Sequence, residues 1–195
     1  DPRITGRVTL ADGAAQVPRL GLTLKAIGIT AESDGRDRIR FEGRLRSGGE
    51  LRFNGRMQWP ADNARDWSAE LALSGERIEA VKIPEAWALV SPNLRLRARP
   101  RRVDVEGELV IPEARIEPLQ TSAAVPVSRD VILVNAPDDL AAVRAPWDLY
   151  SQVRVVLGEK VRFKGFGLTG NINGSITTTD EPEKMTTARG ELSVT

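Results

Sequence analysis

Residues 38–58 read RIRFEGRLRSGGELRFNGRMQ, and apolar and charged side chains alternate along almost their whole length. On either side of the turn signal Ser47-Gly48-Gly49, every second position holds an apolar side chain or a glycine. The apolar members are Ile39, Phe41, Leu45, Leu51, Phe53 and Met57. Side chains two positions apart lie on the same face of a β-strand. The stretch therefore predicts a β-hairpin with one apolar face and one charged face.

The same alternation continues through most of the chain, and no segment has the spacing of a convincing amphipathic helix. Leu22 and Leu24 follow one phase while Ile27 and Ile29 follow the opposite one, which predicts a bulge at Ala26. Turn signals separate the alternating runs at Asp12-Gly13, Asp34-Gly35, Ser74-Gly75, Pro92-Asn93 and Asp180-Glu181-Pro182. The sequence therefore predicts an all-β fold built on a long, antiparallel-rich sheet.

Glycine interrupts the predicted apolar face repeatedly. The pattern apolar–x–Gly–x–apolar, where x is any residue, recurs at several places. Examples are Phe41, Gly43 and Leu45; Phe53, Gly55 and Met57; Val105, Gly107 and Leu109; and Leu168, Gly170 and Ile172. A glycine inside a strand packs nothing and marks a bend, a bulge or a close approach of another group. Two interpretations follow: the glycines curve a closed sandwich or barrel, or they fold the sheet into a trough whose apolar inside is not completely filled.

The 195 residues are expected to form one unit, since the strand pattern runs from end to end. The chain begins abruptly at Asp1 and stops in mid-alternation at Thr195, so we expect a segment excised from a longer protein. Residues 118–146 break the pattern and are expected to form an irregular, partly mobile connection. Within them, the apolar run 131–134 is expected to add an edge strand.

Composition excludes several classes of function. The chain has neither cysteine nor histidine, which removes thiolate nucleophiles, the commonest general base and the usual zinc ligands. Acidic residues are scattered between arginines, so we expect no enzyme, no metal and no cofactor. With 28 basic and 27 acidic residues, the net charge of +1 argues against a nucleic-acid-binding protein.

The C-terminal third resembles the conserved domain of the TamB family. The resemblance rests on Val153-x-Val155-x-Leu157, the run Gly158 to Phe163, Gly165-Phe166-Gly167-Leu168, Gly170, Gly174 and Gly190-Glu191-Leu192, with Ser128 to Val134 upstream. It is best over residues 105–194. Further toward the N-terminus only the rhythm of strands and glycines supports it.

This resemblance implies a fold and a setting. The fold would be a long sheet bent into a U-shaped trough, a β-taco, with an apolar interior. The setting would be the periplasm of a Gram-negative bacterium, with the parent protein anchored in the inner membrane and working with a TamA-like outer-membrane barrel protein. The family is associated with autotransporter assembly and, among AsmA-like proteins, with phospholipid movement between the two membranes. It carries no catalytic motif.

On this interpretation the apolar face is a groove for phospholipid acyl chains, with head groups outside beside arginines such as Arg52, Arg56 and Arg97. The predicted lining residues are Leu22, Leu24, Phe41, Leu45, Phe53, Met57, Leu71, Leu73, Leu96, Val105, Leu109, Val155, Phe163 and Leu168. All of them could equally be ordinary core.

Two other functions stay open. A scaffold or chaperone for outer-membrane β-barrel and autotransporter assembly would bind an extended client at a sheet edge by β-augmentation. A passive structural module would have a filled interior and would hold no lipid.

Overall fold

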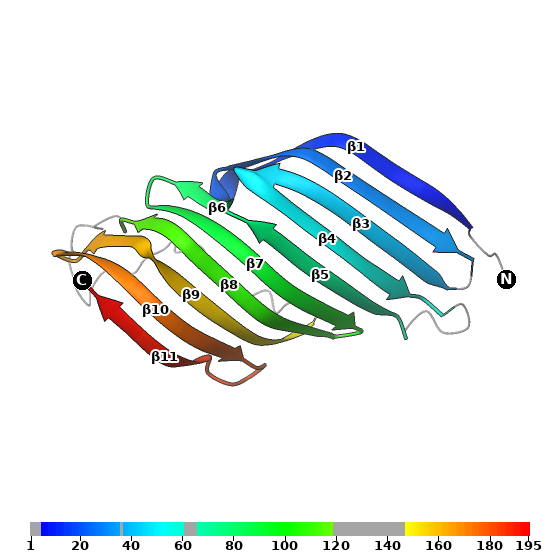
Figure 1. Ribbon diagram of the computed structural model, residues 1–195. Helices are drawn as coiled ribbons and strands as arrows, with labels where there is room; N and C mark the ends of the chain where they lie inside the picture. The colour runs from blue at the N-terminus through cyan, green and yellow to red at the C-terminus, as the bar shows by residue number, and fades with distance from the viewer. Residues whose placement is uncertain (1–4, 36, 61–65, 119–146) are drawn as a thin grey trace, which may run out of the picture.

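A computed structural model describes residues 5–35, 37–60, 66–118 and 147–195. It contains one 11-stranded sheet in a single layer, and the two ends of the chain lie at opposite edges of that sheet (Figure 1). The elements are β1 (Thr5–Val17), the 3-10 helix η1 (Pro18–Leu20), β2 (Leu22–Asp34), β3 (Arg38–Ser47), β4 (Gly49–Gln58), β5 (Ser68–Glu76), β6 (Ile78–Ile83), β7 (Ala86–Arg99), β8 (Arg102–Ile116), β9 (Asp148–Gly165), β10 (Leu168–Asp180) and β11 (Thr187–Val194).

The predicted fold class is confirmed. The sheet has the order β1-β2-β3-β4-β5-β7-β8-β9-β10-β11, with β6 paired to β7 alone, and it curves without closing into a barrel. Residues 38–58 form the predicted hairpin, in which Ser47 lies opposite Gly49 and only Gly48 turns the chain. The bulge predicted at Ala26 is present as well. The β2–β3 register shifts between Lys25 and Gly28, and Ala26 has a φ of 48°.

Three of the predicted turns are wrong. Asp12-Gly13 is a bulge within β1, while Ser74-Gly75 and Pro92-Asn93 lie inside β5 and β7. The chain instead breaks at Arg77, which separates β5 from β6. Both strands pair with β7, β6 along its first half and β5 along its second half. A strand that long can contain a Pro-Asn pair, because different partners occupy the two halves of its edge.

β8 and β9 are parallel, unlike every other pair of neighbouring strands in the described part of the sheet. A parallel pair needs a long crossover connection, because the end of one strand and the start of the next lie at opposite ends of the sheet. The connection predicted over 118–146, with its edge strand at 131–134, lies outside the described residues apart from Pro118.

Phenylalanine and glycine interlock across the β3–β4 hairpin. Phe41 lies opposite Gly55, and Gly43 lies opposite Phe53. A Cβ atom added to Gly43 would lie 2.3 Å from Cζ of Phe53, and one added to Gly55 would lie 2.5 Å from Cζ of Phe41. Each ring therefore covers the backbone of the opposite glycine. These two dents are filled from the neighbouring strand, which gives part of the reason for glycine on the apolar face.

The buried residues gather at the end of the sheet where β6 pairs with β7. They are Leu22, Ile78, Leu89, Ala114 and Val161, together with Ser47, Pro92 and Gly165. The Ser47 hydroxyl donates a hydrogen bond of 2.9 Å to the Glu79 carbonyl oxygen, so the hairpin tip satisfies part of the free edge of β6. Glu79 itself accepts a hydrogen bond from the Trp87 indole, which lowers the pKa of that carboxyl group.

A charged cluster fixes the start of the parallel pair. Arg102 donates to Asp104 from Nε at 2.9 Å and from Nη2 at 2.6 Å, and its guanidinium lies 3.8 Å from the centroid of the Tyr150 ring. The amide of Asp148 donates to the Arg101 carbonyl at 2.7 Å. The ring contact and the backbone hydrogen bond join β8 to β9, while the hydrogen bonds to Asp104 hold the Arg102 guanidinium in place within β8. The hydrogen bonds from Arg102, with a further one from Arg99, lower the pKa of Asp104.

Gly55→Ala should destabilise the fold by about 1–3 kcal/mol, because the new methyl group would lie 2.3 Å from the Glu70 carbonyl oxygen. Urea unfolding followed by circular dichroism measures the change. The matched control is Gly6→Ala, since a Cβ atom at Gly6 meets nothing within 4 Å. Equal stability of the two variants would contradict the interlock.

Asp104→Asn should weaken the acid dependence of stability. Because the folded pKa of Asp104 is lowered, the stabilisation is present above the ordinary carboxyl value of about 3.9 and is lost as the pH falls through the folded value. Below about pH 4 the original chain should therefore lose more of its unfolding free energy than the variant, by at most about 1 kcal/mol for this partly solvated pair. Acid and urea titrations of both chains measure the difference, and an equally steep loss of stability in the variant would contradict a stabilising role for this ion pair.

Candidate functional site

The strand register places all the predicted lining residues on one face of the sheet, called here the apolar face. Directly opposed residues share a face. One row across the strands is Val8, Ala31, Phe41, Gly55, Leu71, Leu96 and Val105. The next is Leu10, Ile29, Gly43, Phe53, Leu73, Leu94, Gly107 and Val153.

The remaining predicted residues extend this face toward its two ends. Met57 lies opposite Ile39 and Ala69, and Leu109 lies opposite Val155. The bulge at Ala26 brings Leu22 and Leu24 onto the face despite their different phase. Phe163 lies opposite Ile116 and Gly170, and alternation places Leu168 beside them.

Most of the apolar face is only half-buried. Of the predicted lining residues, Leu22 is buried at 8% exposure, Leu168 is exposed at 68%, and the others are intermediate. A sheet face normally becomes buried when a second layer packs on it. Within the described residues these side chains contact one another but are not enclosed, so the face retains apolar surface in contact with solvent.

The predicted list of lining residues left out several members of the face, although the alternation had already placed Ile39 and Leu51 on it. Ile29, Ile39, Leu51, Leu94, Val103 and Val153 occupy the same rows as the predicted residues and are half-buried like them. The alternation in the sequence places all of them on the same face as the predicted lining residues. Hairpin tips and bulges, by contrast, need the observed register.

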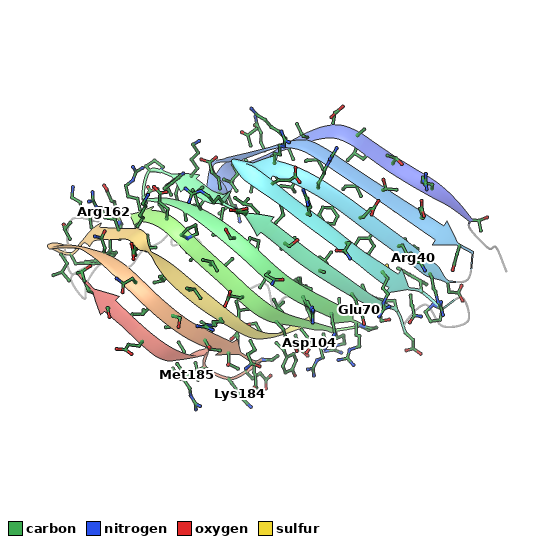
Figure 2. The ribbon with its side chains drawn as sticks, viewed as in Figure 1. Arg40, Glu70, Asp104, Arg162, Lys184 and Met185 are labelled. Atoms are coloured by element: carbon green, nitrogen blue, oxygen red, sulfur yellow. The ribbon has the colours of Figure 1, made fainter. Side chains whose placement is uncertain are left out.

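The opposite face is charged, and its side chains pair across strands. One row runs Arg7, Glu32, Arg40, Arg56, Glu70, Arg97, Asp104 and Tyr150. Figure 2 shows Arg40, Glu70 and Asp104 in line across the sheet. Ion pairs join Arg7 to Glu32 and Arg56 to Glu70, the latter at 2.7 Å. Exposed pairs of this kind stabilise little, so the face is chiefly a solvated surface.

Two hollows lie on this charged face, with volumes of about 720 and 750 Å³. The first lies among Arg40, Arg56, Glu70 and Arg97, and the second among Thr9, Arg44, Arg52 and Asn54. Cations and carboxylates are mixed in both linings. The arginines predicted to lie outside the groove, Arg52, Arg56 and Arg97, do point away from the apolar face.

The described residues offer no cluster of metal ligands. No group of three or more carboxylates among them could hold a metal ion. In the same part of the chain, no helix combines the length and apolar character needed to cross a membrane. What the arrangement does offer is a wide apolar surface backed by a charged one.

Comparison with known proteins identifies the family to which the chain belongs. The family model for the TamB C-terminal domain matches residues 37–195. The chain is also similar to the translocation and assembly module subunit TamB of Haemophilus influenzae (strain ATCC 51907 / DSM 11121 / KW20 / Rd), with 26% identity over 185 residues. That match covers 85% of this chain but only 14% of the relative. No solved structure matches. From the family match over residues 37–195, the chain belongs to the TamB C-terminal domain family.

Proposed function

We propose that the apolar face carries phospholipid acyl chains as part of a TamB-like protein that moves lipid between the inner and outer membranes of a Gram-negative bacterium. The observation that supports this most is the continuity of the face from β1 to β8. Over these strands apolar side chains or glycines follow one another, and most of them remain half-exposed.

The dimensions suit an acyl chain. The row from Val8 to Val105 crosses six strand spacings, which at about 4.8 Å each span roughly 29 Å. One leaflet of a bilayer has a hydrocarbon thickness of about 15 Å, half of the usual 30 Å core. The row is therefore longer than one acyl chain, so a chain could move along it without leaving apolar surface.

The energetics favour a continuous surface. Removing a methylene from water is worth about 0.8 kcal/mol, so a chain of sixteen carbons represents roughly 12 kcal/mol. At any gap in the apolar surface part of the acyl chain would be exposed to water, and the free-energy cost of that exposure would be a barrier to movement. Leucine, valine, phenylalanine and glycine on the face offer few polar groups that could hold one lipid in place.

The wider setting is part of the proposal. The parent protein would be anchored to the inner membrane, extend through the periplasm and meet a TamA-like barrel protein at the outer membrane. It would act as a carrier and not as an enzyme. The name of the Haemophilus relative, a translocation and assembly module subunit, agrees with such a partnership.

A scaffold for outer-membrane protein assembly is the second candidate. The observation that favours it is the open edge of the sheet at both ends of the strand order, where β1 and β11 each pair with one neighbour in the described region. An open edge can pair with an extended client through main-chain hydrogen bonds. A photo-crosslinking residue at Leu192 in β11 would then capture nascent barrel proteins.

A photo-crosslinking residue at Leu71, introduced into the parent protein in cells with labelled phospholipid, should become attached to lipid. The matched control is Ala72, the next residue of β5, which lies on the charged face opposite Asn54 and Arg95. Leu71→Asp should lower lipid transfer roughly tenfold or more, because a carboxylate would interrupt the apolar row. Equal labelling at the two positions, or normal transfer by a folded Leu71→Asp variant, would refute the carrier proposal.

A further inference from the structure

The hairpin tip between β9 and β10 presents apolar side chains directly to solvent. Gly165 pairs with Leu168, so Phe166 and Gly167 alone form the turn. Phe166 is 81% exposed and Leu168 is 68% exposed. The Phe166 ring stacks on Phe163 with centroids 6.5 Å apart, yet most of its surface remains uncovered. This tip is the most exposed aromatic point of the described sheet.

The backbone of the tip does not favour phenylalanine. Phe166 has a φ of 52° and Gly167 a φ of 78°, the signs expected for a type I′ turn. The first position of that turn prefers asparagine, aspartate or glycine, while a bulky residue in the left-handed region is strained. Local conformation thus argues against an aromatic residue here, and so does solvation. Strained residues of this kind point to a function outside the fold.

Two basic side chains, Arg162 and Lys164, lie in β9 next to the tip. Arg162 lies opposite Asn171 in β10 and Arg115 in β8, and Lys164 lies opposite Thr169. Both side chains are exposed, and neither forms an ion pair with another residue of the described ranges. Figure 2 shows Arg162 at the end of the sheet where β9 turns into β10. Arg162 is four residues from Phe166, roughly 13 Å along the strand.

We propose that the tip of the β9–β10 hairpin docks on an anionic phospholipid bilayer, with Phe166 and Leu168 entering the interface and Lys164 and Arg162 reaching the head groups. An aromatic residue on one side and basic residues on the other are the features that place a segment at a membrane surface. Long basic side chains keep their charged ends at the level of the phosphates while their stems follow the inserted residue.

A bilayer fits this tip better than a folded protein partner. A specific protein interface buries about 800 Å² on each side and needs complementary shape. The exposed apolar groups here form a narrow turn with glycine on both sides of Phe166, which offers little area but can enter a fluid surface. The proposal does not depend on acyl chains moving along the apolar face.

Flotation of the full chain with vesicles tests the proposal. The original chain should bind vesicles of phosphatidylcholine and phosphatidylglycerol in equal parts more strongly than vesicles of phosphatidylcholine alone. Phe166→Asn should lower binding about tenfold, because the variant has no aromatic ring at this position to transfer from water into the membrane interface. Its thermal stability should equal or exceed that of the original chain, because Asn-Gly is the preferred type I′ turn. Phe166→Gly provides a second variant compatible with the turn.

Charge variants and a control complete the design. Lys164→Gln and Arg162→Gln should each lower binding about fivefold on the anionic vesicles and leave binding to neutral vesicles unchanged. Met185→Asn removes a side chain that is 90% exposed in the β10–β11 turn, far from Arg162 in Figure 2, and should not change binding.

Three results would overturn the proposal. The first is unchanged binding by a folded Phe166→Asn variant. The second is an equal loss of binding by Met185→Asn, which would show a general effect of exposed apolar side chains. The third is an absence of vesicle binding by the original chain, which would leave a protein surface as the partner of the tip.

Discussion

Because the described sheet is a single layer, its apolar side chains obtain their shelter mainly from neighbours on adjacent strands. Phe41 on Gly55 and Phe53 on Gly43 are the tightest examples, since each ring occupies the space above an opposed glycine. A cross-strand pair of this kind removes apolar area from water without a second layer. The rest of the face follows from the same constraint: contacts between neighbouring strands hold it together, and no second layer of described residues packs on it.

The same constraint explains why the two faces differ so sharply. A strand buried on both sides would read as a continuous apolar run, whereas these strands alternate arginine or glutamate with leucine or phenylalanine. The charged face keeps the sheet in water and adds specific contacts, such as Arg102 with Asp104 and Tyr150, where strand register needs support. The charged face thereby supports a sheet whose other face is apolar.

Local pattern was enough to predict the β-class, the β3–β4 hairpin, the bulge at Ala26 and the common face of the predicted lining residues. It failed where pairing depends on distant segments. Pro92 and Asn93 have the composition of a turn, yet β7 continues through them because β5 and β8 pair with it there. Nothing in the neighbouring residues indicates that β6 pairs only with β7, or that β9 lies parallel to β8. The apolar exposure of Phe166 likewise needs the turn geometry to become visible.

The parallel arrangement of β8 and β9 also bears on how the sheet assembles. Neighbouring strands from β1 to β4 and from β7 to β8 can pair as soon as a short turn closes, but Arg102 and Asp148 are 46 positions apart, from 102 to 148. The entropy of closing a loop rises with its length, so pairings between distant residues form late. Until β9 arrives, β8 is an uncovered edge that any other strand could join. During synthesis from the N-terminus, β8 therefore waits longer for its next partner than the strands before it do.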